Sequence, residues 1–556
     1  MFLSRLAERR WLAPVLLLAL CGFLFFYGLN AGELYRTENL RAIIASEFLR
    51  SGNWVVPTLY GEPLFTKPPG MYAAIALVSW PFGGVNEWTA RLPSALAATA
   101  TVFLFCWYFR RQLGRRAGLI AAVIVPLSPM WLDKAPAAEI DMLQVMWVAA
   151  AILFFLRALE AEDATVTGWQ GDRVTEGEAS RHPVTLPPCH RGRWFWWLAA
   201  LLCVAGGFLT KWTAPAFFYL AVVPLLWWRG RLRLLLGRHH LLAAAAAGGV
   251  CLAWAGAAVA LAGWDDFYGT VSREAIQRLS PPHHREIRRL MAPGHEPPPY
   301  PLLEALVHPF KLLAMNAPWS AFALLTLRRS FWRRWDDRGR FLLQAMHCWV
   351  WPNLVFWSVI PEHAPRHSFP LFPGIAGLAA LVWIGLPAPS ASEGLGFAPR
   401  WRSGLVKKLR PAYLLTAMVV AWLIVKVVFV EVVVPRRNPA RQPREKGEQI
   451  AAVVPKGQPL YLFRLKDEGI MFYYSRLRRA ADGPPVRRLG GPSDLPSGGE
   501  PVYCVVDQKE QDSWNLARPT QTLLRLKDEQ GAPIVLLRVG DAAELARRPP
   551  APEDAP

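Results

Sequence analysis

The sequence of 556 residues is apolar and strongly basic: 53% of the residues are hydrophobic, 26 are tryptophans and the formal net charge is +20. A basic chain can bind nucleic acid. Here much of the positive charge lies in short stretches between apolar runs, and no basic domain has interleaved aromatic residues, so we reject a nucleic acid partner. The seven cysteines are scattered, without a Cys-x-x-Cys pair or metal-ligand spacing. We therefore expect neither a disulfide framework nor a structural zinc site.

Apolar runs of about membrane-spanning length recur from residue 11 to residue 434. The first run, 11–29, follows a basic flank, and we predict an uncleaved first helix because the run is long enough to cross a bilayer. Ten more runs bring the predicted number of spans to about eleven. They cover residues 91–109, 117–132, 142–159, 194–210, 212–228, 240–263, 303–327, 341–360, 369–387 and 411–434. The sequence thus predicts an all-α multi-pass membrane domain over residues 1–434.

Arginine and lysine are concentrated in five of the segments between these runs. The segments are 110–116, 160–193, 229–240, 328–340 and 400–410. If the N-terminus is cytoplasmic, all five lie on the cytoplasmic side, as the positive-inside rule predicts. We therefore expect a protein of the cytoplasmic (inner) membrane with a cytoplasmic N-terminus and with its C-terminal segment outside.

The first outer loop, 31–90, contains two further helical segments. Residues 69–83 are apolar but too short to span easily, and proline and glycine bound them, so we predict an interfacial or re-entrant helix. Residues 38–50 have apolar positions at helical spacing with polar residues opposite, which predicts a second helix lying in the membrane interface.

The composition changes after residue 434. Short runs typical of strands occur at 459–464, 502–507, 522–526 and 534–539, and a helix is predicted at 445–454. We predict a small soluble α/β domain outside the membrane at residues 435–545. A disordered, proline-rich tail is expected at 546–556.

Ionisable residues recur near the predicted outer ends of the membrane helices, where they are costly unless they pair or serve a function. They include Glu38, Lys67, Asp141, Lys211, Arg366 and His367. A carboxylate can accept a proton from an attacking hydroxyl, and lysine or arginine can neutralise a phosphate. Any one of these charges, taken alone, is more often a solvated loop residue. Together they indicate an enzyme that acts on an anionic substrate.

Five motifs resemble, in order, those of the GT-C type membrane glycosyltransferases, in particular the bacterial lipid A aminoarabinose transferases and the protein O-mannosyltransferases. They are TENLRAIIASEFLRSGNWVVPTLYGEPLFTKPPGMY, EIDMLQVMWVAAAILFF, GGFLTKWTAPAF, REAIQRL and RHSFPLFPGIAGLAAL. The resemblance covers about the first 370 residues, and an α/β outer domain after the last span also fits it. It implies transfer of a sugar from a polyprenyl-phosphate donor to a hydroxyl or phosphate of a lipid, glycan or protein acceptor.

By this resemblance, Glu38 is the second acid of the family's acidic pair, and Lys67 is the lysine of its Glu-Lys-Pro motif. Thr37 stands where the family has its first acid, and Thr66 stands where it has the glutamate. A threonine hydroxyl is not a base at neutral pH without an activator. The base is therefore Glu38 or Asp141, or the mechanism is altered, or the protein is inactive. We predict Glu38 as the base, assisted by Asp141.

The resemblance also implies two sets of binding residues. Lys67, Lys211, Arg278 and Arg366 are expected to bind the donor phosphate, and Thr37, Thr66, Glu274 and His367 are expected to position the substrates. Attack on the anomeric carbon would displace the lipid phosphate with inversion. No nucleotide cofactor is expected, and a divalent metal ion stays open.

Two alternatives remain open. A multi-pass lipid or solute transporter would explain the spans equally well, but it predicts mid-membrane charges and paired repeats. Lys426 is the clearest mid-span charge, and the sequence contains no internal repeat that we detect. A non-catalytic relative of the glycosyltransferases would explain Thr37 and Thr66. We favour the enzyme because the charges gather at the predicted outer face.

Overall fold

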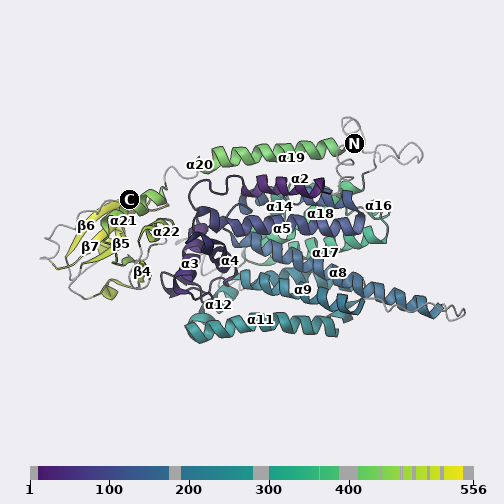
Figure 1. The fold of residues 1–556 in the computed structure, drawn as a ribbon, viewed down its shortest axis with the longest axis horizontal. Coiled ribbons are helices and arrows are strands. Elements are labelled where there is room, and N and C mark those ends of the chain that lie inside the picture. Colours follow the sequence, from purple (N-terminus) through teal and green to yellow (C-terminus); the bar gives the residue numbers. More distant parts are fainter. Residues whose placement is uncertain are drawn as a thin grey trace. The chain divides into compact units, whose positions relative to one another are not determined.

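The computed structural model describes residues 11–174, 189–279, 300–361, 364–386, 411–436, 441–463, 465, 467–478, 484–496, 501–513 and 519–541. Most of them are helical, and a five-stranded sheet is formed near the C-terminus (Figure 1). The chain divides into two compact units. The membrane unit comprises Met1–Tyr27, Thr66–Gly70 and Ser94–Lys426, and the sheet unit comprises Gly28–Phe65, Met71–Pro93 and Val427–Pro556.

Six described helical segments are long and apolar enough to cross a membrane. They are Glu87–Leu113 (α5), Ile140–Asp163 in α8, Gly192–Thr210 in α9, Arg238–Ala262 (α11), Pro365–Ile384 and Tyr413–Arg436. Shorter apolar helices cover Leu12–Phe26, Gly70–Phe82 and Ala214–Trp228. The chain is therefore a multi-pass membrane protein, whereas the number of about eleven spans stays a prediction.

The remaining bounds of the helices in this part of the chain are as follows. They are α2 Leu12–Cys21, α6 Arg115–Ile124, α7 Pro129–Lys134, α8 Ile140–Val174, α9 Cys189–Thr210, α10 Ala214–Trp228, α12 Trp264–Leu279, α14 Leu302–Met315, α15 Trp319–Leu325, α16 Arg329–Trp332, α17 Asp337–Val359, α18 Phe372–Ile384 and α19 Pro411–Val428.

Two of the predicted spans are broken into shorter helices. The run 117–132 is divided into α6 and α7, and the run 303–327 is divided into α14 and α15. Pro126 follows α6 and Pro318 precedes α15. Proline has no amide hydrogen and disfavours the helical conformation of the residue before it, so a continuous helix ends at these places.

Small residues allow α8 and α9 to approach closely. A Cβ atom placed on Gly206 would lie 2.9 Å from the Trp147 ring of α8, and one on Gly207 would lie 3.3 Å from the Trp147 Cβ atom. Such contacts are typical of helices in membranes, where close van der Waals packing holds helices together.

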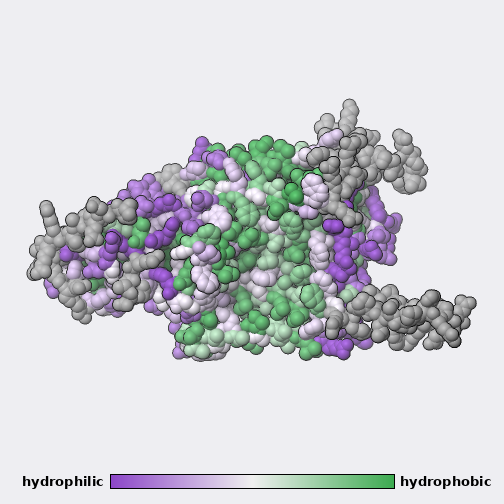
Figure 2. Space-filling view, viewed as in Figure 1, coloured by the Kyte–Doolittle hydropathy of each residue, from purple (hydrophilic) through white to green (hydrophobic). Residues whose placement is uncertain are grey.

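Figure 2 shows the hydropathy of the molecular surface. Hydrophobic residues dominate the visible face of the helices, and hydrophilic residues gather at the end near α16.

The sheet unit has an α/β core. Its strands are β3 Leu460–Phe463, β4 Val486–Leu489, β5 Val502–Asp507, β6 Thr520–Lys527 and β7 Pro533–Val539, in the order β4-β3-β5-β7-β6. Strands β4, β3 and β5 are parallel, whereas β5, β7 and β6 are antiparallel. Its helices after residue 440 are α21 Pro443–Val453, α22 Glu468–Leu477 and α23 Gln508–Ser513.

The α/β prediction is confirmed for the described C-terminal residues. All four predicted strands and the predicted helix are present within a few residues of their expected bounds. Three further elements, α22, α23 and β4, are not predicted from the sequence. Strand β4 has the sequence VRRL, whose two arginines give no apolar run to recognise. The predicted tail at 546–556 lies outside the described residues.

Most of the predicted first outer loop, in the segments Gly28–Phe65 and Met71–Pro93, belongs to the same compact unit as the C-terminal residues. It contributes α3 (Thr37–Ser51), the hairpin of β1 (Thr58–Leu59) and β2 (Glu62–Pro63), and α4 (Gly70–Ser79). The Tyr473 hydroxyl of α22 accepts a hydrogen bond of 3.1 Å from the Leu34 amide and donates one of 3.0 Å to Glu87. Arg444 and Arg476 also form ion pairs with Glu87.

The two helices predicted in this loop are confirmed as helices. The helix predicted at 38–50 is α3, and three charged residues of its polar face, Glu38, Arg41 and Glu47, are buried. Its place in the membrane interface stays a prediction. The division into compact units also differs from the one predicted along the sequence. The domain boundaries at 434 and 545 therefore stay predictions.

Candidate active site

Asp141 and Lys211 form a buried ion pair in the membrane unit. Asp141 lies in the first turn of α8, where the helix dipole favours a carboxylate. Lys211 directly follows α9, where the chain turns into α10. Lys211 Nζ donates a hydrogen bond of 2.7 Å to Asp141 Oδ1, and the two side chains are only 4% and 6% exposed. The sequence predicts both as site residues without linking them, and the fold brings them together.

Further charges lie beside this pair, just before α8. Lys134 Nζ is 3.1 Å from Asp133 and 3.6 Å from Glu139, and the Glu139 side chain is buried. Burial alone lowers the pKa of Lys134, but the carboxylates of Glu139, Asp133 and Asp141 together raise it above its ordinary value. Lys134 is thus a cation at neutral pH. Lys134 is not among the site residues predicted from the sequence, although its position close before Asp141 is a usable signal.

Lys67 forms a second ion pair, with Glu274 of α12. Lys67 Nζ donates hydrogen bonds of 2.7 Å to Glu274 Oε2 and 2.6 Å to the carbonyl oxygen of Thr66. The charged side chains are 17% and 19% exposed. Two prolines follow Lys67 and prevent a regular helix at this point. This pair is therefore more accessible than the first one.

The segment that carries Lys67 lies against the turn that carries Lys211. Trp212 Nε1 donates a hydrogen bond of 3.4 Å to the carbonyl oxygen of Thr66. A Cβ atom on Gly70 would lie 2.7 Å from a carbonyl oxygen in the last turn of α9, so only glycine allows this approach. The two ion pairs consequently lie on neighbouring segments of one unit.

Glu38 lies in the sheet unit, in the first turn of α3, and forms a bidentate ion pair. Arg91 donates from Nε to Glu38 Oε1 at 3.0 Å and from Nη2 to Oε2 at 3.1 Å, and the Tyr35 amide donates to Oε2 at 2.8 Å. The two charged side chains are 5% and 7% exposed. The same guanidinium donates to the main-chain carbonyls of residues 29, 31, 32 and 33. This arrangement fixes the loop that precedes α3.

The other predicted site residues lie in several places. Thr37 begins α3, and its hydroxyl accepts a hydrogen bond of 2.9 Å from Arg41. Arg278 belongs to α12, but its side chain lies outside the described residues. Arg366 and His367 lie in the 3-10 helix Pro365–Leu371, the first exposed and the second buried. The roles given to these residues stay predictions.

Arg91 is a further charged residue that the sequence analysis did not select. It stands at the very start of the predicted span 91–109, and a charge at the end of an apolar run is a usable signal. Its partner lies 53 residues away, which no local pattern indicates. Among the described residues, no three His, Cys, Asp or Glu side chains are grouped so that they could hold a metal ion.

The combination of a helical membrane unit with a small α/β unit resembles the fold of the GT-C type membrane glycosyltransferases. The solved structure of ArnT from Cupriavidus metallidurans bound to undecaprenyl phosphate shares it, with a TM-score of 0.65 over 94% of this chain and 97% of that chain. The two sequences are 17% identical. At this level of identity the likeness shows the fold alone.

Sequence comparison points to the same group. The profile described as dolichyl-phosphate-mannose-protein mannosyltransferase matches residues 66–170. The undecaprenyl phosphate-alpha-4-amino-4-deoxy-L-arabinose arabinosyl transferase 2 of Sodalis glossinidius is 26% identical over 367 residues, which cover 66% of this chain and 58% of that protein. The corresponding transferase of Erwinia tasmaniensis is 25% identical over 63% of this chain and 56% of its own. The matches thus cover less than two thirds of these relatives. The resemblance to GT-C type glycosyltransferases is confirmed.

Proposed function

We propose that this chain is a glycosyltransferase that moves a sugar from a polyprenyl-phosphate donor to an acceptor hydroxyl or phosphate at the outer face of the cytoplasmic membrane. The observation that carries the proposal is the neighbourhood of two ion pairs, Lys67 with Glu274 and Lys211 with Asp141. The names of the relatives, which are undecaprenyl-phosphate aminoarabinose transferases, support this class of donor.

The two lysines are suited to bind the donor phosphate. Each ammonium group is already held at a fixed position by a carboxylate at 2.7 Å. Fixed cations stabilise the negative charge that develops on a departing phosphate, because they need no reorganisation during the reaction. Lys67 is the more exposed of the two, so we expect it to contact the phosphate first. Arg278 and Arg366 would add charge on the same substrate.

Asp141 is the stronger of the two candidate bases. Glu38 gives both of its oxygens to Arg91, so we assign it a positioning role. Asp141 instead shares a unit with both lysines that would bind the phosphate. In the proposed reaction, Asp141 accepts the proton of the acceptor hydroxyl while the acceptor oxygen attacks the anomeric carbon. The bond from this carbon to the lipid phosphate breaks, and the phosphate leaves with the electron pair, with inversion at the carbon.

The residues next to the lysines would act as positioning residues. Thr66 holds Lys67 through its carbonyl oxygen, and Glu274 holds it through its carboxylate. This arrangement supports the proposal despite the threonine at residue 66, because Glu274 supplies a carboxylate to the same lysine. We assign the outer side to these residues, and the cytoplasmic side to the N-terminus, on the distribution of arginine and lysine between the helices.

The test is a transfer assay with the purified full chain in detergent or liposomes. The protein is incubated with undecaprenyl-phosphate sugars, a lipid A acceptor and a short peptide acceptor, and the release of undecaprenyl phosphate is measured. Asp141→Asn should lower the rate by a factor of about 10² to 10⁴, the usual contribution of a general base. Lys67→Ala should mainly weaken donor binding and raise KM.

Matched variants separate these effects from general damage. Asp265→Asn removes an exposed carboxylate from α12, and Lys311→Ala removes an exposed ammonium from α14. Both should leave the rate unchanged. If the unmodified protein released no lipid phosphate from any donor, the enzyme hypothesis would fail in favour of the non-catalytic relative. Movement of the intact donor across liposome membranes without release would instead identify a transporter.

A further inference from the structure

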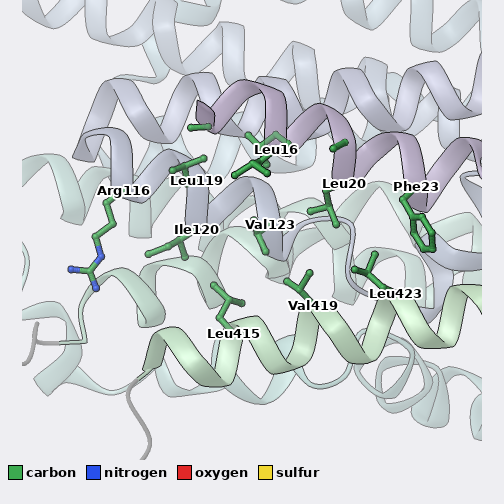
Figure 3. A pocket seen from close by; sticks show the side chains of 13 residues that line it. Leu16, Leu20, Phe23, Arg116, Leu119, Ile120, Val123, Leu415, Val419 and Leu423 are labelled. Carbon is green, nitrogen blue, oxygen red and sulfur yellow. The ribbon is translucent and has the colours of Figure 1, made fainter. Parts of the chain in front are cut away.

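A hollow with apolar walls lies between three helices of the membrane unit, α2, α6 and α19. Its volume is about 420 Å³. Side chains from all three helices point into it, and Arg116 lies at one end, where α6 begins (Figure 3). The residues that form most of the wall include Leu16, Leu20, Leu119, Val123, Leu415 and Val419. Arg116 is the one charged residue of the wall in the part of the chain that the structure describes.

A second hollow, of about 560 Å³, adjoins the first one. The two share wall residues from α2 and α6, which makes them neighbours. The second hollow extends towards α5 and is lined by Arg110, Arg111 and Arg115. Together with Arg116, four arginines therefore border one end of the apolar space. All four are exposed.

This combination matches an amphipathic ligand with long apolar chains and a negatively charged head. The apolar hollow can take hydrocarbon chains, and guanidinium groups bind phosphate oxygens in a bidentate manner. Of the four arginines, Arg111 lies 3.8 Å from Glu160, a long contact in an exposed position. Within the described residues, Arg110 and Arg116 have no carboxylate within 4 Å. The guanidinium groups of Arg110 and Arg116 are thus available to a phosphate.

Helix α19 leaves room for such a ligand. Most of the apolar surface of this region is uncovered, since only 11% of the most apolar stretch within Tyr413–Arg436 is buried inside the protein. Leu415, Val419 and Leu423 follow one another at intervals of four residues, so they form one stripe that faces the hollow. Hydrocarbon chains in the hollow would complete the contact between this stripe and α2.

The hollow is distinct from the proposed donor site. The Ser94 hydroxyl near the start of α5 donates a hydrogen bond of 3.2 Å to the carbonyl oxygen of Glu139, two residues before Asp141. Arg110 follows sixteen residues later in the same helix. At 1.5 Å per residue, the arginines lie roughly 24 Å along α5 from the Asp141 end. One phosphate cannot occupy both places.

We propose that an anionic glycerophospholipid binds in this hollow, with its acyl chains between α2, α6 and α19 and its phosphate on the arginines at residues 110, 111, 115 and 116. An anionic lipid is favoured over a zwitterionic one, because a zwitterionic head brings its own cation to a site that already carries four. The site does not depend on the proposed transfer reaction.

The test measures lipid binding to the full chain after removal of native lipid. Phosphatidylglycerol and phosphatidylethanolamine with identical acyl chains are titrated separately, and bound lipid is counted by native mass spectrometry. The unmodified protein should bind phosphatidylglycerol at least about tenfold more tightly. The triple variant R110Q/R115Q/R116Q should abolish this preference, and Val419→Trp, which fills the apolar hollow, should weaken the binding of both lipids.

Two controls make the outcome specific. The triple variant R328Q/R329Q/R333Q removes three exposed arginines from another basic stretch and should leave the preference intact. Phosphatidylglycerol with a photoreactive acyl chain should label α2 and α19 in the unmodified protein. Equal losses in both triple variants would overturn the site in favour of unspecific surface charge. Displacement of phosphatidylglycerol by undecaprenyl phosphate would show that the hollow is a prenyl site and overturn the proposal. Labelling of other helices, or unchanged lipid binding in Val419→Trp, would refute the hollow as the site of the acyl chains.

Discussion

Variants of the ion pair between Glu38 and Arg91 can distinguish a positioning role of Glu38 from a catalytic one. In Glu38→Gln the shape of the side chain is kept, but the buried guanidinium loses its counter-charge. Removing one partner of a buried ion pair typically costs about 3–5 kcal/mol. We expect the lower end of this range, about 3 kcal/mol, because glutamine still accepts one hydrogen bond.

Arg91→Met should cost more than Glu38→Gln. This variant leaves the Glu38 carboxylate buried and also removes the guanidinium that donates to four main-chain carbonyls. Hydrogen bonds to charged groups contribute about 1.5–3 kcal/mol each, so the loss should reach about 5 kcal/mol or more. The double variant should be more stable than the sum of the single losses predicts, because it leaves neither charge alone.

The free energy of unfolding is measured by denaturant titration in mild detergent, with tryptophan emission as the signal. Glu62→Gln, which removes an exposed carboxylate from the same unit, is the matched control and should not change stability. Transfer is measured in parallel under conditions where Glu38→Gln is still folded, and we expect a rate within about tenfold of the unmodified protein. A stable Glu38→Gln variant with no transfer activity would refute this reasoning and restore Glu38 as the base.

Three further predictions concern other residues. Burial and the nearby Glu529 carboxylate raise the pKa of Asp467 from 3.8 to about 7. The folded protein therefore holds this proton more tightly than the unfolded chain does, and stability should fall by up to about 4 kcal/mol as the pH rises from about 4 to 7. Asp467→Asn, which can still cap α22, should flatten this pH dependence in thermal unfolding scans, and an unchanged slope would contradict the prediction. Lys211→Met should strongly lower the unfolding midpoint because it leaves the buried Asp141 carboxylate unpaired. Adding Asp141→Asn should recover part of this loss, and the absence of any recovery would argue against the ion pair. Gly70→Ala should reduce both stability and transfer, because its Cβ atom would lie 2.7 Å from a carbonyl oxygen. Gly84→Ala, with open space around residue 84, should change neither. Equal effects of the two variants in unfolding and transfer assays would disprove the close approach at Gly70.

The helices and strands were largely predictable because their signals are local. Apolar runs of membrane length predict helices, and a proline lies where the runs 117–132 and 303–327 are each divided into two helices. Alternating and apolar runs predict β3, β5, β6 and β7. Strand β4 is not predicted because its sequence, VRRL, contains no apolar run, and it forms through its pairing with β3. The charges near the helix ends were also visible as departures from apolar composition.

The pairing of those charges was decided by the tertiary structure alone. Lys67 and Glu274 are 207 residues apart, Lys211 and Asp141 are 70 apart, and Arg91 and Glu38 are 53 apart. Sequence periodicity reports on neighbours within one helix or strand, and it contains no information on which distant helix ends meet. For the same reason the sequence predicts Glu38 as the base, with Asp141 assisting, without showing which partners each carboxylate meets. The packing of the chain pairs Glu38 with Arg91 and Asp141 with Lys211, and our proposal of Asp141 as the base rests on this difference in partners.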